Sequence, residues 1–311
     1  MEGHEQSGLR TQSVEWIKAH LGETAEITDI KPLTGGTSSL LFELAIRENG
    51  NVFYYVLRLF HKADWLKKEP DLAKHEAASL QFAEQAGFSV PHLIAYDETG
   101  EQSGMPAVLM TKVSGSVVLQ PSNDEKWLES LAALLAKLHQ TNAGDFPYEY
   151  YSYNNAFLLE KPTWSKVQND WMRAFYIVAG SRPQAQQCFI HRDFHPANIL
   201  WKNGEITAIV DWVNACRGPA GIDVGHCRVN LAQMYGISVA NDFLAAYQRY
   251  AGSSFTYDPY WDLVSLTDTL DGSPVVYPGW QAFGMKGLSD ELMRHRLDDY
   301  LLSLLDRFDD F

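Results

Sequence analysis

One stretch in the second half of the chain, residues 188–228, constrains the fold and the chemistry more than any other. It reads CFIHRDFHPANILWKNGEITAIVDWVNACRGPAGIDVGHCR. Asp193 and Asn198 are five residues apart, close enough for one tight loop to present both side chains, and Asp211 follows the apolar run TAIV. Phosphoryl transfer from a nucleoside triphosphate uses such a trio, because one carboxylate accepts the proton of the attacking hydroxyl while an amide oxygen and a second carboxylate hold magnesium ions. We therefore predict Asp193 as the catalytic base and Asn198 and Asp211 as metal ligands.

The first part of the chain carries the signals of a small antiparallel sheet. The segments ITDIKPL, LLFELAI and VFYYVLRLF, between residues 25 and 60, are rich in β-branched and aromatic residues, and Asn49-Gly50 between the last two is a strong hairpin dipeptide. Helical periodicity occurs at residues 11–21 and 71–85, and PAVLMTKV predicts a further buried strand. The small polar residues 114–116 that follow mark the expected boundary of this lobe.

The rest of the chain has mainly helical patterns. Apolar stripes at helical spacing cover residues 122–141, 164–179, 241–251, 258–270 and 295–308. Residues 146–157 are crowded with Tyr and Asn without a clean period, so a loop is expected there. The sequence therefore predicts an α+β fold, with an N-terminal antiparallel β-sheet lobe that includes a helix (residues 1–114) and a mainly helical C-terminal lobe (residues 115–311).

The residues around Asp193 resemble the signature of the aminoglycoside phosphotransferase family, a branch of the protein-kinase-like superfamily. That signature is H-x-D-x-x-x-x-N, often with a second His after the Asp, followed by a strand that ends in Ile/Val-Asp-Trp/Phe. The matching residues are His191, Asp193, His195, Asn198, Val210, Asp211 and Trp212. The resemblance spans roughly residues 27–247 and implies a bilobal kinase-like fold, with a nucleotide-binding N-terminal lobe, a hinge near residues 109–115 and a substrate cleft in the C-terminal lobe. It also implies transfer of the γ-phosphoryl group of ATP or GTP, with Mg²⁺, to a hydroxyl of a small molecule.

A cation is expected on the third strand, because kinase-like folds place one there to touch the phosphates and to pair with a helix carboxylate. Arg58 lies where the family often has Lys, and Glu76 in the following helix is the expected partner. Glu69 is the competing carboxylate, although it precedes Pro70 and is expected ahead of the helix. The planar guanidinium should still bind phosphate oxygens, with a different geometry from an ammonium group. The simpler alternative is a strand Arg paired with a surface carboxylate.

Two further segments are candidates for nucleotide contacts. A polar loop with two glycines lies between two predicted strands, and it would cover the phosphates through the backbone N–H groups of Gly35, Gly36, Thr37 and Ser38, although an ordinary hairpin turn would look similar. The resemblance implies that LMTKVSG is the hinge, where the Thr111 carbonyl and the Val113 N–H would bond to the purine edge. No GxxxxGK[ST] motif occurs, which excludes a P-loop enzyme.

The acceptor is expected to be a small-molecule alcohol, because the segment after Asp211 has neither the Gly of D-F-G nor an A-P-E motif, so a protein substrate is disfavoured. Residues 146–157 and 261–280, with Asp262, Asp268 and Asp271, could line a substrate cleft or could serve packing and surface roles. Aminoglycosides, macrolides, choline and homoserine all remain candidate acceptors. The alternative is a catalytically silent nucleotide-binding protein of the same fold, which only the Arg at position 58 favours.

Several other residues near the predicted catalytic residues are not expected to take part in the chemistry. Asp223 matches an acidic residue that the family often has after the metal-binding Asp, and a role in holding the catalytic loop is expected for it. His195, His226 and the three cysteines lack the spacing of a zinc site, so His195 is expected to pack or to form hydrogen bonds within the loop. Arg192 lies where many small-molecule kinases have a small residue. In protein kinases an Arg at this place binds a phosphorylated activation loop, but the short segment after Asp211 lacks A-P-E, so no such loop is expected here.

Composition narrows the classes of partner. The net charge of −14 and the isoelectric point of about 5.1 argue against a nucleic-acid-binding protein and would favour a cationic small molecule. The polar start MEGHEQSGLR does not resemble a signal peptide, and no run approaches the ~20 apolar residues of a membrane helix. Three widely spaced cysteines indicate reduced thiols, so a cytoplasmic location is predicted.

Overall fold

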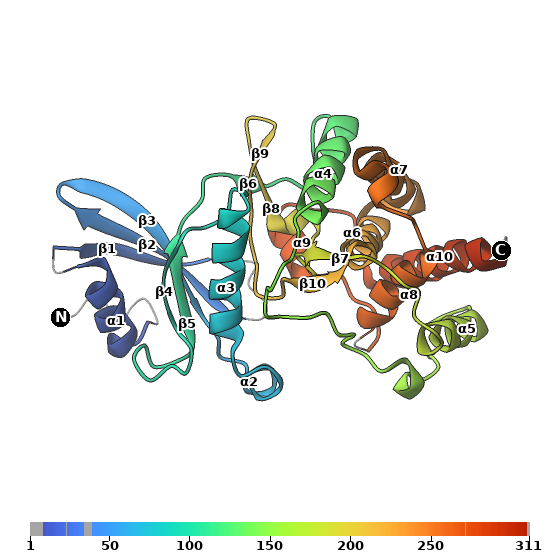
Figure 1. Cartoon of the computed structure of the whole chain (residues 1–311), viewed down its shortest axis with the longest axis horizontal. Helices are drawn as coiled ribbons and strands as arrows, with labels where there is room; N and C mark the ends of the chain where they lie inside the picture. Colours follow the sequence, from blue (N-terminus) through green and yellow to red (C-terminus); the bar gives the residue numbers. More distant parts are fainter. Residues whose placement is uncertain (1–8, 23, 34–38, 271, 310–311) are drawn as a thin grey trace. The chain divides into compact units, whose positions relative to one another are not determined.

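The computed structural model describes residues 9–22, 24–33, 39–270 and 272–309 (Figure 1). The chain divides into two compact units, each built from two stretches of sequence. The first unit comprises Met1–Ser116 and Ile199–Asn214, and the second comprises Val117–Asn198 and Ala215–Phe311. The sequence predicted a single boundary after residue 114, and it did not anticipate that residues 199–214 group with the first unit.

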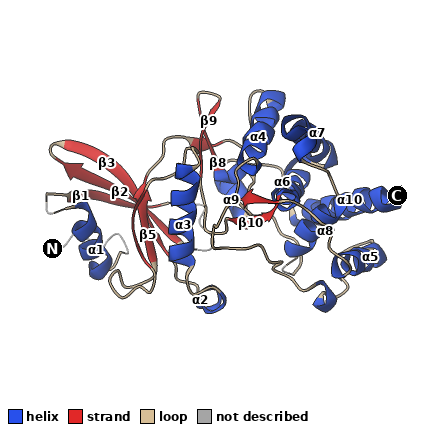
Figure 2. Ribbon diagram, in the orientation of Figure 1, coloured by secondary structure: helices blue, strands red, loops and turns tan. Residues whose placement is uncertain are grey.

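Five antiparallel strands form the sheet of the first unit (Figure 2). They are β1 (Glu26–Pro32), β2 (Leu40–Glu48), β3 (Asn51–Leu59), β4 (Leu93–Asp97) and β5 (Ala107–Thr111), in the order β1-β2-β3-β5-β4. The β2–β3 hairpin turns at Asn49 and Gly50, whose φ angles are 49° and 83°. A two-residue hairpin turn of this type requires positive φ at both positions, which Asn and Gly tolerate. The dipeptide therefore fixes the register that places Glu48 opposite Asn51.

Three helices accompany this sheet: α1 (Thr11–Leu21), α2 (Ala63–Lys68) and α3 (Leu72–Gln85). The bounds of α1 coincide with the predicted range, and its Trp16 and Ile17 are buried in one cluster with Leu44 and Leu57 of the sheet. α3 packs against β4 and β5. Burial of one such large apolar side chain stabilises the fold by roughly 1.5–3 kcal/mol. The sheet and its helices thus share one core.

The second stretch of the first unit is a hairpin of β8 (Ile199–Lys202) and β9 (Glu205–Ile209). Thr207 Oγ1 donates a hydrogen bond of 2.7 Å to the carbonyl of Ser114, and Ile209 N donates one of 3.1 Å to the carbonyl of Ser89. Gly115 has a φ of +130°, and a Cβ there would lie 2.5 Å from Thr207 Oγ1. The close approach that glycine permits explains why this hairpin groups with the first unit.

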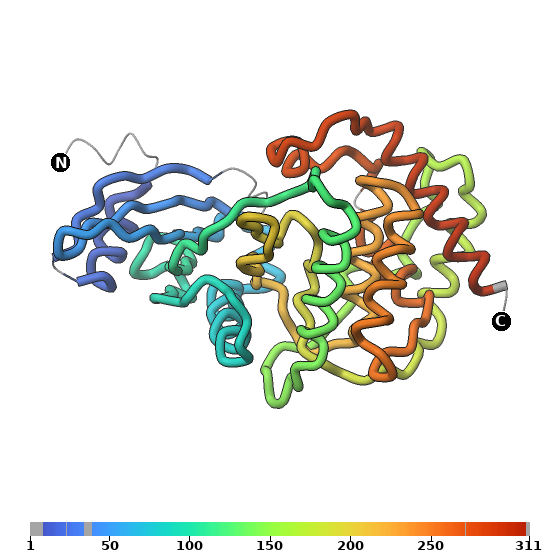
Figure 3. The backbone as a smooth tube through the Cα atoms, turned by 90° about the horizontal axis from the view of Figure 1, so that it is seen from above, coloured from blue at the N-terminus to red at the C-terminus, as the bar shows by residue number. Residues whose placement is uncertain are grey.

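The second unit is mainly helical. Its helices are α4 (Asp124–His139), α5 (Gln168–Ala179), α6 (Ala220–Tyr235), α7 (Ile237–Ala251), α8 (Pro259–Asp268), α9 (Pro278–Ala282) and α10 (Asp290–Asp309), with 3₁₀ turns at Ala156–Leu158, Pro196–Asn198 and Gly252–Ser254. A short antiparallel pair, β7 (Gln187–Ile190) and β10 (Cys216–Pro219), completes it, and the two-residue strand β6 (Ser116–Val117) lies at the division between the units. α4 and α7 lie side by side (Figure 3). None of the helices in the described part of the chain is both long and apolar enough to cross a membrane.

α6 is the central helix of the second unit and packs against α7, α8 and α10. Twelve of its sixteen residues are buried. Two glycines let α8 approach closely: a Cβ on Gly221 would lie 2.5 Å from the Trp261 ring, and one on Gly225 would lie 2.8 Å from the Trp261 carbonyl oxygen. α6 is therefore enclosed by its neighbours on nearly every face.

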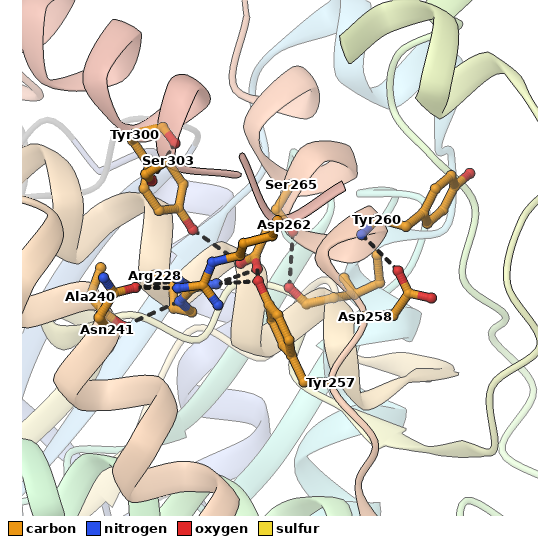
Figure 4. Close-up of polar contacts among 12 residues, drawn as sticks. Arg228, Ala240, Asn241, Tyr257, Asp258, Tyr260, Asp262, Ser265, Tyr300 and Ser303 are labelled. Carbon is orange, nitrogen blue, oxygen red and sulfur yellow. Dashed lines mark hydrogen bonds and ion pairs between the residues drawn. The ribbon is translucent and has the colours of Figure 1, made fainter. Parts of the chain in front are cut away.

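A buried polar network ties α6 to the surrounding helices (Figure 4). The fully buried Arg228 of α6 forms an ion pair with Asp262 of α8, and it donates a hydrogen bond of 2.9 Å to Asn241 Oδ1 of α7. Asp262 also accepts hydrogen bonds from Tyr257 (2.5 Å) and from Tyr300 of α10 (3.0 Å). For Asp262 the sequence left open a place in the substrate cleft or a packing role, and the structure supports packing, because the carboxylate is enclosed with Arg228.

Candidate functional site

The catalytic loop predicted from the sequence follows β7 and is held by Asp223. Both backbone N–H groups at the start of the loop donate to this buried carboxylate: His191 N at 2.8 Å and Arg192 N at 2.6 Å. His139 Nε2 lies 3.1 Å from Asp223 Oδ2. Arg192 has a φ of +66°, an uncommon conformation for a non-glycine residue. The carboxylate thus fixes a strained turn directly before Asp193, which is the structural role expected for Asp223.

The side chain of Arg192 packs among tyrosines of the predicted loop 146–157. Its guanidinium carbon lies 3.8 Å from the ring centroid of Tyr153, 4.2 Å from that of Tyr151 and 5.3 Å from that of Tyr150. Arg192 Nη2 also donates a hydrogen bond of 2.5 Å to the Tyr151 carbonyl. Cation–π contacts of this kind contribute about 0.5–2 kcal/mol each. Arg192 therefore anchors this aromatic segment against the loop, a role that no motif in the sequence revealed.

Asp193 and Asn198 lie together, as their spacing predicts. The Asn198 Nδ2 group donates to the Asp193 carbonyl at 2.9 Å and to Asp193 Oδ2 at 3.1 Å. Because its amide nitrogen is engaged with Asp193, the amide oxygen is the atom through which Asn198 could ligate a cation. The 3₁₀ turn Pro196–Asn198 brings the two side chains together within the loop.

Two histidines adjoin the Asp193 carboxylate. His226 Nε2, from α6, lies 3.0 Å from Asp193 Oδ1, and His195 Nε2 lies 3.8 Å from the same atom. Desolvation would raise the pKa of Asp193, but the hydrogen bond from His226 and the nearby imidazoles lower it well below the ordinary aspartate value. Desolvation likewise opposes the charged form of His226, yet its hydrogen bond with Asp193 raises the pKa of the imidazole. Asp193 is therefore a carboxylate at neutral pH.

His226 is the site residue that sequence reasoning failed to place. The signal that could have found it is its spacing from Asp223: three residues apart on a helix, the two side chains share one face. Asp223 bonds to the catalytic loop, so His226 on the same face reaches Asp193. Using that spacing requires knowing that the segment is helical, and α6 has no amphipathic stripe because most of its residues are buried.

The first unit carries a second polar cluster, centred on Arg58 of β3. Arg58 Nη1 lies 2.7 Å from Glu76 Oε1 of α3 and 2.7 Å from Asp211 Oδ1, and Arg58 Nε donates a hydrogen bond of 2.8 Å to Ser39 Oγ. Glu76, rather than Glu69, is therefore the partner of Arg58. Burial alone would lower the pKa of Arg58, but the charges of Asp211 and Glu76 raise it above its ordinary value. Arg58 remains a buried cation.

Asp211 lies two residues beyond the end of β9, close to the predicted strand end, with a φ of +65°. Its side chain is 33% exposed, whereas those of Arg58 and Glu76 are almost fully buried. Carboxylate and amide oxygens are the ligands that Mg²⁺ prefers in proteins. The partly exposed carboxylate of Asp211 and the amide oxygen of Asn198 thus fit magnesium by the chemistry of their donor atoms.

The other residues predicted to contact the nucleotide lie in two segments of the chain, residues 35–38 and 111–113. Gly35, Gly36, Thr37 and Ser38 lie outside the described residues. Thr111 ends β5, where its N–H donates to the His92 carbonyl at 2.9 Å and its Oγ1 accepts from His92 N at 2.8 Å. Val113, two residues beyond the strand, is half-buried. The Thr111 carbonyl and the Val113 N–H remain candidates for contact with a base.

Of the other acidic residues suggested for a substrate cleft, Asp268 can be compared with the structure. Asp268, at the end of α8, accepts a hydrogen bond of 3.1 Å from Asn154 N, and Asn154 Nδ2 donates one of 2.9 Å to the Thr267 carbonyl. Asp268 thus anchors the aromatic segment that also contacts Arg192. Asp271 lies outside the described residues.

Comparison with known proteins gives an independent view of the chain. Residues 29–265, more than half of the chain, match the model of the Phosphotransferase enzyme family. No curated protein matches the chain.

Solved structures resemble the chain over nearly its full length. A presumed aminoglycoside phosphotransferase from Ralstonia eutropha JMP134 is 14% identical with a TM-score of 0.65, covering 96% of this chain and 99% of its own. Macrolide 2′-phosphotransferase MphH from Brachybacterium faecium is 15% identical with a TM-score of 0.58, covering 93% and 98%. A thermostable mutant of aminoglycoside phosphotransferase APH(4)-Ia, in complex with ADP and hygromycin B, is 16% identical with a TM-score of 0.58, covering 93% and 97%. At these identities the likeness establishes the fold.

Proposed function

The chain belongs to the phosphotransferase enzyme family, and we propose that it transfers the γ-phosphoryl group of MgATP or MgGTP to a hydroxyl of a small molecule. The observation that carries this proposal is the geometry of the catalytic loop. Asn198 is bonded to the Asp193 side chain, and Asp223 fixes the turn that precedes Asp193. A loop that holds one carboxylate and one amide oxygen next to each other supplies the base and a metal ligand of phosphoryl transfer.

Asp193 is the proposed catalytic base. Its lowered pKa keeps the carboxylate ionised at neutral pH, so it can accept a hydrogen bond from the acceptor hydroxyl and orient the oxygen for in-line attack. Such a weak base takes the proton late, when the hydroxyl has become acidic through bond formation to phosphorus. Positioning and charge neutralisation, rather than strong basicity, would therefore account for most of the rate enhancement.

The nucleotide contacts are proposed for the first unit. Arg58 would bind phosphate oxygens while Glu76 fixes its guanidinium, and Asn198 and Asp211 would hold Mg²⁺. Magnesium, when bound, neutralises the charge on the phosphates. The backbone N–H groups of Gly35, Gly36, Thr37 and Ser38 would cover the phosphates, and the Thr111 carbonyl and the Val113 N–H would contact the base.

The acceptor is proposed as a small-molecule alcohol, with cationic compounds favoured by the net charge of −14. The structural neighbours include a macrolide phosphotransferase and an aminoglycoside phosphotransferase bound to hygromycin B. Both classes of compound belong in an acceptor panel, together with choline and homoserine.

Thermal-shift titration with MgATP and MgGTP, followed by a coupled assay for nucleoside diphosphate over the acceptor panel, tests the proposal. We expect stabilisation by at least one nucleotide and turnover with at least one hydroxyl compound. Binding without turnover over a broad panel would support the silent nucleotide-binding alternative. Failure to bind either nucleotide would contradict both.

A further inference from the structure

The group of side chains around the proposed base has the composition of a metal site of another kind. One ligand atom from each of Asp193, His195 and His226 lies within 4.8 Å of those of the other two. Asp193 and His195 come from the catalytic loop and His226 comes from α6, so the group forms only in the folded second unit. His195 is 8% exposed, while the side chains of Asp193 and His226 are 28% and 23% exposed. The group is thus preorganised yet reachable from solvent.

The distances suit a tetrahedral ion. Zn²⁺ binds imidazole nitrogen and carboxylate oxygen at about 2.0–2.2 Å, which places neighbouring ligand atoms of a tetrahedral site about 3.4 Å apart. The Asp193 oxygen lies 3.0 Å from His226 Nε2 and 3.8 Å from His195 Nε2, on either side of that value. The third pair, between the two imidazoles, is also within 4.8 Å, so side-chain rotations that draw the ring nitrogens together would bring all three atoms into position. A fourth position would remain for water.

Ligand chemistry separates this group from the magnesium ligands. Mg²⁺ prefers oxygen ligands and keeps several waters, whereas imidazole suits Zn²⁺, Co²⁺ and related ions. Asn198 and Asp211 offer oxygen, while His195 and His226 offer nitrogen. Sequence spacing had argued against zinc here, because His226 is 33 residues from Asp193 and joins it only through the packing of α6.

We propose that Asp193, His195 and His226 bind one Zn²⁺ or a similar transition-metal ion, and that this ion inhibits the enzyme. Once its oxygen is coordinated, Asp193 cannot accept the proton of a hydroxyl. The binding site is independent of the proposed function, whereas the inhibition rests on it. The simpler assignment, in which the same three side chains form only an ion pair and hydrogen bonds, is the outcome that would overturn the proposal.

Titration of the full-length protein, freed of metal by dialysis against a chelator, with Co²⁺ as a coloured substitute for Zn²⁺ tests the site. We expect one equivalent of Co²⁺ to give the visible absorption of a four- or five-coordinate ion, and one equivalent of Zn²⁺ to abolish it. His226→Gln and His195→Gln should each weaken binding by at least about tenfold, since each removes a ligand. His226→Asn is a second substitution that guards against a folding defect peculiar to His226→Gln.

The matched control is His295→Gln, because His295 of α10 also lies near a carboxylate, with Nε2 3.6 Å from Asp299 Oδ2, but outside the group. This variant should bind Co²⁺ as the wild type does. Three results would overturn the site: no absorption up to millimolar Co²⁺, binding unaffected by His226→Gln and His226→Asn, or a thiolate-to-cobalt band that assigns the ion to the buried cysteines.

Inhibition is measured separately, as Zn²⁺ suppression of MgATP and MgGTP hydrolysis without an acceptor. The Zn²⁺ concentration that halves the rate should rise at least about tenfold in His226→Gln relative to wild type and should be unchanged in His295→Gln. Equal sensitivity of wild type and His226→Gln would overturn the inhibitory role. Absence of hydrolysis in every variant, with Co²⁺ binding intact, would count against the proposed function and leave the metal site standing.

Discussion

Arg58 shows how one side chain can serve several partners. A single guanidinium contacts Glu76, Asp211 and Ser39 from its Nη1 and Nε atoms, which an ammonium group could not do with the same fixed geometry. The Arg58–Glu76 pair was expected from the resemblance to kinase-like folds, which pair a cation on the third strand with a carboxylate of the following helix. The sequence did not predict Ser39, because a serine next to a polar loop carries no distinguishing pattern.

Replacing Arg58 by Met should destabilise the protein by about 3–5 kcal/mol, because the change leaves the buried Glu76 carboxylate without its cation. Burial raises the pKa of Glu76, so the carboxyl of the variant should take up a proton and the loss should shrink at acid pH. Urea unfolding at pH 5 and pH 8 measures both effects. Arg58→Met combined with Glu76→Leu should recover part of the loss. A loss below about 1 kcal/mol at pH 8 would contradict this role.

The Asp193–His226 pair should give stability a defined pH dependence. The folded-state pKa of Asp193 is lowered, so its contribution is present above about pH 3.9 and is lost as the pH falls through the folded value. The folded-state pKa of His226 is raised, so its contribution is complete below about pH 6.5 and is lost as the pH rises through the folded value. The pair therefore stabilises most between these limits. The Tm difference between wild type and His226→Gln should be largest near pH 5–6 and should shrink by pH 9.

The control for that pH series is again His295→Gln, whose side chain is 64% exposed. Its Tm difference from wild type should stay small at every pH. A difference for His226→Gln that is flat, or that grows with pH, would contradict the pairing.

At the scale of elements, the sequence predicted those whose burial is one-sided. α1 has the predicted bounds, and α4 is capped by Asn123, whose Oδ1 accepts from Lys126 N at 2.9 Å. α6 was missed because it is buried on nearly all faces, and a helix without a polar face shows no stripe to detect. Because α6 was not predicted, the position of His226 beside Asp193 was not predicted either. The loop 146–157 was expected, but its anchoring by Arg192 depends on tertiary contacts that no local pattern records.

Gly225→Ala tests the packing of α6 against α8. Helix propensity alone predicts that Ala stabilises a helix interior by about 0.5–1 kcal/mol relative to Gly. The added Cβ would lie 2.6 Å from Ser265 Oγ and 2.8 Å from the Trp261 carbonyl oxygen, so overpacking should prevail and cost about 1–3 kcal/mol. Equilibrium unfolding decides by the sign of the change. A stabilised variant would show that the two helices separate at little cost.

For the molecule as a whole, the proposed roles are distributed over both units. Arg58, Glu76 and Asp211 belong to the first unit, and Asp193 and Asn198 belong to the second. The residues Asp193, Asn198 and Asp211 could be predicted from the sequence, because phosphoryl transfer requires particular residue types at short spacing. The grouping of residues 199–214 with the first unit could not be predicted, because it depends on the close approach of Gly115 and Thr207.

The second unit should depend strongly on its enclosed ion pair. Asp262→Asn leaves the fully buried Arg228 without its charged partner and should cost about 3–5 kcal/mol. Glu129→Gln is the matched control, because it removes an ion pair between Glu129 of α4 and Arg249 of α7. Their side chains are 31% and 60% exposed, so this change should lower the free energy of unfolding by less than about 1 kcal/mol. Urea unfolding of both variants measures the contrast. Similar losses would show that burial does not decide the strength of the pair.

Asp193→Asn tests most directly the proposal that Asp193 is the catalytic base of a phosphotransferase. The measurement is single-turnover transfer of a labelled γ-phosphoryl group from enzyme-bound nucleotide to an acceptor identified in the panel. We predict that the variant binds the nucleotide within about twofold of wild type, because no nucleotide contact is proposed for Asp193. Its rate of transfer should fall about 10²–10⁴-fold. Transfer at the wild-type rate by Asp193→Asn would contradict the proposal.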